Sequence, residues 1–360
     1  MTALSLRPRC RSVGRTSVLA SFEEYFHPDR PAPRAHYSTG QIAAHMHRVL
    51  QGRGPVDYVG ERAHGGLRAD VFVGHFWSFA EYVQRNRFGR SVAFYPVADP
   101  AWTRAVLTPL AAELGVPVPE WDLPPAGFDH EATMELADLV VLVGNRTTLA
   151  TFPARWRSKI RLLNYAPDER VHLPSPRPRP RDDFCYVATW CDLRKGFMDV
   201  LDTWDQAPLG NAASSSRLHV IGGLKAPWRR LVERRGIPAL VYHGFVDSHT
   251  AAFRALVRAC RFAHIPTWSE GQMGTLLEVA AQGCVPLTTA ISGVDEEVLR
   301  HCLVVRPRDI AGQRAALAEA LSWPPDQYAR RRRALRAAVR RHHSWDAFER
   351  GFAAALEEVS

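Results

Sequence analysis

Two glutamates stand eight positions apart in the segment AHIPTWSEGQMGTLLEVAAQGCVPLTTA, residues 263–290. The pattern predicts a buried strand, a loop over TWSEGQMG that contains Glu270, and a helix over TLLEVAAQ that contains Glu278 and ends at Gly283. The first amides of a helix have no backbone acceptors and carry the positive end of its dipole. The turn between the glutamates is therefore suited to binding a phosphate.

Carboxylates on both sides of an anion site are repelled by the anion unless the ligand gives them hydrogen-bond donors. A sugar diol can donate two hydrogen bonds to one ionised carboxylate, at about 1.5–3 kcal/mol each. The two glutamates thus suggest a ligand with hydroxyl-bearing rings on both sides of a diphosphate. The alternative is structural: Glu270 is an acid favoured by the helix dipole, and Glu278 is a surface residue of the helix.

The elements that must position this segment alternate along the whole chain. Short apolar runs alternate with longer helical patterns such as residues 40–50 and 100–114, which is typical of parallel sheets built from βαβ units. We expect strands over residues 17–22, 69–74, 91–97, 139–144, 160–164, 184–189, 217–222, 239–244, 262–266, 284–289 and 302–305.

The region between the fifth and sixth of these strands is dense in proline and charge, which predicts an exposed connection. We therefore expect an α/β chain with two doubly wound, Rossmann-like parallel-sheet domains, residues 1–167 and 184–343, joined by a linker over residues 168–183. In such sheets ligands bind beyond the carboxyl ends of the strands, which places the Glu270 loop in a cleft between the domains.

The composition of the 360-residue chain gives a formal net charge of +9, which favours phosphates, acidic lipid surfaces or nucleic acid as partners. Much of this charge lies in residues 327–343, where Leu335, Ala338 and Val339 recur at helical spacing. The pattern predicts a solvated arginine face on an amphipathic helix, with a membrane-surface or nucleic-acid contact as the alternative.

The sequence also disfavours membrane-spanning, secreted and zinc-binding proteins. There is no apolar run of membrane-spanning length and no signal-peptide pattern, so we expect a cytoplasmic protein. The six cysteines lack the spacing of zinc sites and are expected to be reduced thiols.

The segment SEGQMGTLLEVAAQGCVPLTTAISGVDEEV, residues 269–298, resembles the E-x7-E donor-site segment of the family-four retaining GT-B glycosyltransferases, the group 1 type. Further segments resemble this family in the same order, so the resemblance covers nearly the full length. They are HYSTGQIAAHMHRVLQGRG (36–54), ADVFVGHF (69–76), ADLVVLVGNRTTL (137–149), FCYVATWCDLRKGFMDVLDTW (184–204), VYHGFVDSHTAAFRALVRACRFAHIPTWSEG (241–271) and HSWDAFERGFAAAL (343–356).

The resemblance implies a GT-B fold, with residues 344–360 forming a closing helix that packs back on the first domain. It implies that Glu278 binds the ribose hydroxyls and that Glu270 binds the hydroxyls of the transferred sugar. His75 would lie near the reacting sugar as a second catalytic residue, donating a hydrogen bond or steadying charge. Lys195 would offset the diphosphate charge as a compact cation in a chain that otherwise favours arginine. The other implied donor-binding residues are Gly40, Val246, Gly271, Gln272, Met273, Gly274 and Thr275.

Three positions depart from the family pattern. Thr189 stands where the family has an arginine before the K-G lysine, and Arg194 is the nearest substitute, although neighbouring side chains rarely share a helix face. Thr39 replaces the first glycine of the N-terminal pair, and Met273 replaces a glycine between the two glutamates. These departures bear on diphosphate binding, on the approach of the N-terminal loop and on the shape of the sugar pocket.

The resemblance implies a retaining transferase that moves a sugar from a nucleoside-diphosphate sugar, of the UDP or GDP type, to a hydroxyl of a saccharide, lipid or natural product. No obligatory cofactor or metal is expected, because the sequence has no D-x-D motif. A peripheral membrane contact at the inner face through the arginine-rich helix is the alternative to a solvated face, and nucleic acid is not expected. The alternatives are a nucleotide-sugar epimerase, a phosphorylase, or a non-catalytic GT-B protein whose arginine-rich helix binds membrane or nucleic acid.

Overall fold

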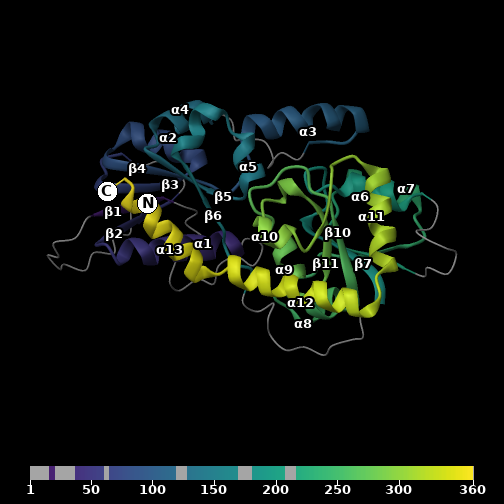
Figure 1. Ribbon diagram of the computed structural model, residues 1–360. Helices are drawn as coiled ribbons and strands as arrows, with labels where there is room; N and C mark the ends of the chain where they lie inside the picture. The colour runs from purple at the N-terminus through teal and green to yellow at the C-terminus, as the bar shows by residue number, and fades with distance from the viewer. Residues whose placement is uncertain are drawn as a thin grey trace.

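The computed structural model of the protein describes residues 16–20, 37–60, 65–118, 128–168, 181–206 and 216–359. These residues form two α/β domains, each built around a six-stranded sheet in which every pairing is parallel (Figure 1). The expected architecture of two doubly wound sheets is confirmed.

The first sheet has the strand order β2-β1-β3-β4-β5-β6. Its strands are β1 (Ser17–Ala20), β2 (Val56–Val59), β3 (Arg68–His75), β4 (Arg87–Tyr95), β5 (Leu139–Val143) and β6 (Ile160–Leu163). The helices around it are α1 (Tyr37–Gln51), α2 (Phe76–Arg85), α3 (Pro100–Leu114), α4 (His130–Leu136), α5 (Arg146–Thr151) and the 3-10 helix η4 (Ala154–Lys159). The inner strands β1 and β5 are buried along their whole length, which explains why they are continuous apolar runs.

The second sheet has the order β12-β11-β10-β7-β8-β9. Its strands are β7 (Arg181–Trp190), β8 (Leu218–Gly223), β9 (Leu240–Gly244), β10 (Cys260–Ile265), β11 (Val285–Thr289) and β12 (Leu303–Val305). Its helices are α6 (Phe197–Trp204), α7 (Ala226–Arg235), α8 (Ala251–Ala259), α9 (Gly274–Gln282), η6 (Ala290–Ser292), α10 (Glu296–Leu299), α11 (Ile310–Ser322) and α12 (Pro325–His342). The last helix of the chain is α13 (Trp345–Glu357).

Three details differ from the expectations drawn from sequence. Strand β2 was not expected, because it is a four-residue edge strand that is only partly buried and carries Asp57. Helix α1 begins at Tyr37, so Gly40 lies in its first turn rather than at its start. The expected strand starts at residue 184, but β7 begins at Arg181. Its first residues Arg181 and Asp182 are polar and exposed, so the sequence pattern does not show that they belong to a strand. Residues 21–22 of the first expected strand lie outside the described residues.

The five cysteines that the structure describes, Cys185, Cys191, Cys260, Cys284 and Cys302, are buried free thiols. They lie in the second domain's core, as expected for small apolar side chains. Cys10 lies outside the described residues.

Two helices link the domains beyond the chain connection itself. Helix α3 starts in the first domain, but its side chains Leu107, Leu110 and Ala111 belong to the core of the second domain, over which α3 extends in Figure 1. Helix α13 follows α12 and packs against α1, β5 and β6 of the first domain. Its Phe348 and Phe352 are buried in that domain's core. Each domain therefore contains a helix that the sequence order assigns to the other.

We predict that Phe352→Ala destabilises the protein by about 3–5 kcal/mol, because a fully buried aromatic ring is lost from the first domain's core. Chemical denaturation followed by circular dichroism measures the change. Arg350→Ala is the matched control on the exposed face of the same helix, with an expected change within about 0.5 kcal/mol. Equal stability of the two variants would show that α13 does not contribute to this core.

Candidate functional site

The loop between β10 and α9, residues 266–273, lies where the two domains meet. The Thr103 hydroxyl of α3 is 2.7 Å from the Ser269 hydroxyl, and the Thr148 hydroxyl of α5 donates to the Gly271 carbonyl at 3.2 Å. A Cβ atom on Gly271 would lie only 2.1 Å from the Pro96 carbonyl oxygen. Glycine is therefore required here for a close backbone approach between the domains.

Gln272 holds the same loop to the end of the first domain. Its amide oxygen accepts from the Tyr165 backbone N–H at 3.2 Å, and its amide nitrogen donates to the Tyr165 carbonyl at 2.9 Å. The Tyr165 hydroxyl donates to the Gln272 carbonyl at 3.0 Å. These three hydrogen bonds fix the loop against the segment that follows β6.

Asn145 makes a further link between the domains. Its side-chain oxygen caps α5 by accepting from the Thr148 N–H, while its amide nitrogen donates to the carbonyls of Ala290 and Val294 at 3.0 and 2.9 Å. The segment that contains these carbonyls supports the loop, because the Met273 N–H donates to the Ser292 carbonyl at 2.8 Å. A helix cap in the first domain thus orients the loop in the second.

Glu270 is buried in this interface, with 5 % of its surface exposed. Its carboxylate accepts a hydrogen bond from the Lys195 ammonium group, and the Arg194 guanidinium donates to it at 3.1 Å. Burial alone would raise the pKa of Glu270, but the charges of Arg194 and Lys195 outweigh burial and lower the pKa below its usual value. Glu270 is therefore an anion with two cations bound to it.

The two cations lie in the turn between β7 and α6. Gly196 closes this turn with a φ of 72°, and a Cβ atom there would lie 2.0 Å from the Pro266 carbonyl oxygen. Because Arg194 and Lys195 precede the helix, adjacent side chains can reach the same carboxylate. The expectation that these neighbouring side chains would not share a face was wrong, because it assumed that both residues lie in a helix. Thr189, at the position of the expected arginine, is exposed.

Glu278 lies on α9 and has the opposite electrostatic environment. Burial, together with the negative charges of Asp168 and Asp247, raises the pKa of Glu278 to about 8. Two identical side chains on one loop and helix thus differ in charge state at neutral pH: Glu270 is ionised, and Glu278 is largely protonated when no ligand is bound.

The first turn of α9 lies between the two glutamates, as predicted. The helix begins at Gly274 and ends at Gln282, and Gly283 follows it with a φ of 95°. The hydroxyl of Thr275 is buried and has no hydrogen-bond partner among the residues that the structure describes. Met273 is 1 % exposed and packs in the second domain's core.

His75 ends β3 and begins the turn into α2, at the carboxyl end of the first sheet. Burial lowers the pKa of His75 to about 3, so its ring is neutral at physiological pH. The ring lies 4.7 Å from the Phe76 ring and 5.3 Å from the Trp77 ring, measured between centroids. Its surroundings suit a hydrogen-bonding imidazole rather than a cation.

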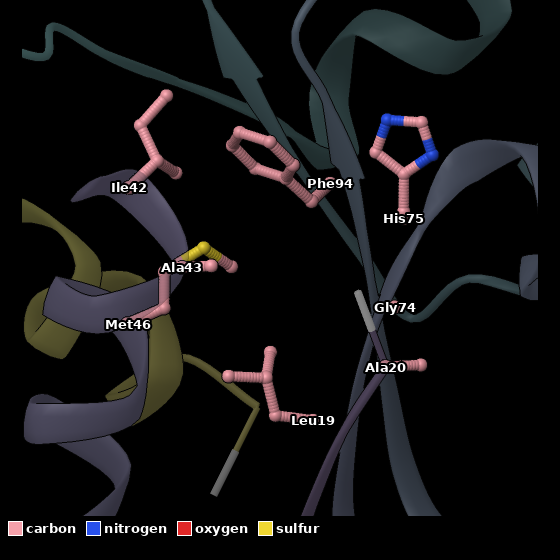
Figure 2. A pocket seen from close by; sticks show the side chains of 8 residues that line it. All are labelled: Leu19, Ala20, Ile42, Ala43, Met46, Gly74, His75 and Phe94. Carbon is pink, nitrogen blue, oxygen red and sulfur yellow. The ribbon is translucent and has the colours of Figure 1, made fainter. Parts of the chain in front are cut away.

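A small hollow lies next to His75, between α1 and the first sheet. Figure 2 shows that Phe94 separates His75 from α1, and it shows the other lining residues, Leu19, Ala20, Ile42, Ala43, Met46 and Gly74. The cavity measures about 10 Å³, which is enough for a single water molecule. Gly40 is buried in the first turn of α1, and Val246 packs against the edge of the second domain's core.

The structure therefore joins Glu270 and Lys195 directly and places Gly271 and Gln272 at the same interface. His75, Gly40 and Val246 lie on other elements, and no hydrogen bond among the described residues joins them to Glu270. Sequence reasoning missed Asn145, although an asparagine directly after a strand is a typical helix cap. It also missed Asp168, which falls in the proline-rich segment taken as a linker and gives no signal of its own.

Comparison with known proteins identifies the fold of the chain. The chain has the GT-B fold, shared with solved structures that include sucrose-phosphate synthase from Thermosynechococcus elongatus, at 17 % identity and a TM-score of 0.65 over 96 % of this chain and 99 % of that one. A UDP-forming trehalose-phosphate synthase from Burkholderia vietnamiensis is similar at 13 % identity, with a TM-score of 0.65 over 96 % and 97 % of the two chains.

A trehalose-6-phosphate structure from E. coli bound with UDP-2-fluoro glucose is similar at 12 % identity, with a TM-score of 0.62 over 96 % and 98 % of the chains. Residues 181–323 match the family model described as Glycosyl transferases group 1. This match spans most of the second domain. The search of curated proteins found no relative.

Across the described ranges, no helix has both the length and the apolar character needed to cross a bilayer.

We predict that Gly271→Ala loosens the domain interface, because the added methyl group must displace the Pro96 backbone. Overpacking of this kind costs about 1–3 kcal/mol. The melting temperature should fall, and small-angle scattering should show a larger radius of gyration. Gly65→Ala, where the new methyl would meet nothing within 4 Å, is the control. A Gly271→Ala protein as stable and compact as the Gly65→Ala protein would contradict this packing.

Proposed function

We propose that the protein is a retaining glycosyltransferase, which moves a sugar from a nucleoside-diphosphate sugar to a hydroxyl group of an acceptor. The observation that carries the proposal is the pair of glutamates on either side of the α9 N-terminus: Glu270 is ionised beside Lys195 and Arg194, and Glu278 lies on the helix itself. The match to the family model described as Glycosyl transferases group 1 supports the same reaction class.

The proposed donor binds along the first turn of α9. The diphosphate accepts hydrogen bonds from the first helix amides and from the Thr275 hydroxyl, whose buried oxygen has no other partner among the described residues. Glu278 takes the ribose hydroxyls on one side, and Glu270 takes the hydroxyls of the transferred sugar on the other. Both carboxylates then accept from the ligand the hydrogen bonds that offset their repulsion from phosphate.

Lys195 and Arg194 have a double role in this proposal. Without donor they neutralise Glu270, which prevents an unpaired charge in the interface. With donor, the sugar hydroxyls satisfy Glu270, and the cations can turn toward the diphosphate as negative charge develops there. Arg194 thereby supplies the guanidinium that is missing at Thr189.

In the proposed reaction, the bond between the anomeric carbon and the diphosphate oxygen breaks while the acceptor oxygen bonds to the same face of the sugar. The acceptor proton passes to the departing phosphate oxygen, so a nucleoside diphosphate leaves. Because burial keeps the ring of His75 neutral, its part is to donate or accept a hydrogen bond near the sugar. Lys195, Arg194 and the helix amides stabilise the leaving group.

The loop and the first domain are closely packed near Glu270: Ser269 contacts Thr103, and a Cβ atom on Gly271 would lie 2.1 Å from the Pro96 carbonyl oxygen. We infer that donor binding lengthens these two contacts, whereas the Gln272–Tyr165 hydrogen bonds can remain. A UDP-sugar is the first donor to test, because one similar structure is bound with UDP-2-fluoro glucose and another is a UDP-forming synthase.

We predict that Glu278→Gln weakens UDP-sugar or GDP-sugar binding by about tenfold to a hundredfold, because an amide cannot accept both ribose hydroxyls. His75→Ala should lower kcat with little change in donor affinity. Calorimetric titration and single-turnover rates separate the two effects. Glu357→Gln, an exposed carboxylate on α13, is the control.

Unchanged donor binding in Glu278→Gln would rule out the assignment of Glu278 to the ribose. Product analysis separates the competing functions. Transfer to an acceptor with retained anomeric configuration supports the proposal, conversion of the donor to its epimer supports the epimerase, and the absence of any donor binding supports the non-catalytic protein.

The exposed arginines of helix α12 are the observation that favours a membrane contact. Leu335, Ala338 and Val339 form its buried face, as predicted. Arg336 donates to the Ala281 carbonyl at 3.0 Å, and Arg331 lies 4.6 Å over the Trp323 ring. The remaining exposed arginines are Arg330, Arg333, Arg340 and Arg341. We infer that this exposed arginine face binds anionic lipid surfaces.

We predict that Arg330→Glu combined with Arg333→Glu lowers binding to phosphatidylglycerol vesicles by about thirtyfold or more, since each arginine contributes about 1 kcal/mol near an anionic surface. Vesicle sedimentation measures it, with phosphatidylcholine vesicles as the neutral control. If the unchanged protein does not bind anionic vesicles, the arginine face is only solvated.

A further inference from the structure

A buried histidine lies where the last two helices of the chain meet the interface between the domains. His343 directly follows α12, and α13 begins two residues later at Trp345. Only 2 % of the surface of His343 is exposed. Neither the proposed reaction nor the proposed membrane contact uses this residue.

The two ring nitrogens of His343 contact two different segments of the chain. Nδ1 is 3.1 Å from the Tyr165 carbonyl oxygen, at the end of the first domain. Nε2 accepts a hydrogen bond from the Asp295 N–H at 3.2 Å, in the segment before α10 of the second domain. A carbonyl oxygen can only accept and a backbone N–H can only donate, so the ring carries its proton on Nδ1 and is neutral. Burial also lowers the pKa of His343 to about 4, which agrees with a neutral ring.

The segment of Tyr165 is one of two supports of the loop that carries Glu270. The Tyr165 carbonyl accepts from the Gln272 amide nitrogen at 2.9 Å and also from His343. A carbonyl oxygen has two lone pairs, so it can accept both hydrogen bonds. The ring of Trp345 also stacks on the Tyr165 ring, at 6.4 Å between centroids. The junction between α12 and α13 therefore fixes the peptide group to which the loop is bound.

The segment of Asp295 is the second support of this loop. Met273, which directly precedes α9, donates its N–H to the Ser292 carbonyl at 2.8 Å. Three residues further on, the Asp295 carboxylate accepts from the Asn164 amide at 3.2 Å, while the Asp295 N–H donates to His343. One imidazole ring therefore bridges the two segments that hold the loop.

The two glutamates depend differently on these supports. Glu270 lies in the loop, two residues before Gln272, so the position of its carboxylate relative to α9 changes when the supports shift. Glu278 lies on α9 itself and does not depend on the conformation of the loop. Because a hydrogen bond weakens steeply as its geometry departs from the optimum, a shifted loop loses contacts of Glu270 and keeps those of Glu278.

We propose that His343 is a positioning residue for the transferred sugar: its neutral ring joins the Tyr165 and Asp295 segments and thereby fixes Glu270 at the distance from α9 that the sugar hydroxyls require. The inference rests on the proposed function, because it takes Glu270 as the residue that binds the transferred sugar. It assigns to the junction between α12 and α13 a part in recognising the sugar of the donor rather than its nucleotide.

The first test compares the affinities for UDP-glucose and for UDP, measured by calorimetry, in the unchanged protein and in His343→Ala. The affinity for UDP-glucose should fall about tenfold, whereas the affinity for UDP should stay within about twofold, because ribose binding by Glu278 is retained. His301→Ala, on the turn after α10, is the control and should change neither affinity. A role that is only structural would lower both affinities by the same factor, which would overturn the proposal.

The variant His343→Asn separates the two contacts of the ring. Its amide nitrogen can donate to the Tyr165 carbonyl from about the position of Nδ1, but it has no acceptor that reaches the Asp295 N–H. The affinity for UDP-glucose should therefore recover to about threefold below that of the unchanged protein. An asparagine variant that binds as weakly as His343→Ala would show that the contact with Tyr165 does not matter, and this would contradict the proposal.

A double-mutant cycle tests the route through Gln272. Gln272→Ala alone should also weaken UDP-glucose binding, because it removes the link between the loop and Tyr165. Adding His343→Ala to Gln272→Ala should then weaken binding by less than about threefold more, instead of the tenfold that an independent effect would add. Full additivity would show that the two residues act separately and would overturn the proposal.

The same titrations separate this proposal from the proposed function. If the unchanged protein binds neither UDP and UDP-glucose nor GDP and GDP-mannose, or if Glu270→Gln binds these nucleotide sugars as tightly as the unchanged protein, the assignment of Glu270 fails and this proposal fails with it. If Glu270→Gln binds UDP-glucose weakly but His343→Ala keeps the unchanged ratio of the two affinities, only the role of His343 is overturned. If His343→Ala does not fold, the ratio measured in His343→Asn decides.

Discussion

The ionised carboxylate of Glu270 is the constraint on which the arrangement of the interface depends. A lone charge at a site only 5 % exposed would cost several kcal/mol, so the fold must bring cations to it. The turn after β7 brings two. Its position is fixed by Gly196, which passes against Pro266, and by the Arg194 carbonyl, which accepts from the Trp268 N–H at 2.8 Å and from the Thr267 hydroxyl at 2.9 Å. The loop that carries the acid thus holds the turn that carries the bases.

The second glutamate shows that residue type does not determine charge state. Glu270 and Glu278 are eight positions apart, yet the first has cationic neighbours and the second has anionic ones. The difference arises from which loops meet α9: the turn after β7 at its start, and the segments around Asp168 and Asp247 along its side. The loop before α9 and the helix itself therefore carry a permanent anion and a titratable acid, which suit different parts of the two-ring donor proposed above.

Much of the fold could be predicted from sequence, because the central strands are continuous apolar runs and α9 has glycines at both ends. The edge strand β2 could not, since half-buried edge strands need fewer apolar residues. In the site, the pairing of Lys195 with Glu270 was not predictable, because their contact joins segments 75 positions apart. Asp168 shows the limit most clearly: its role follows from where the chain leaves the first domain, and a proline-rich segment gives no periodicity from which that position can be inferred.

Helix α3 gives the two domains a shared boundary. Leu107 and Leu110 are buried with the second domain's core although their helix begins in the first, and Glu113 near the end of the helix lies 3.8 Å from Arg308. Moving the two domains apart as rigid bodies would expose to water the apolar side chains of α3 that are now buried. The apolar contacts of α3 therefore oppose any separation of the two domains as rigid bodies.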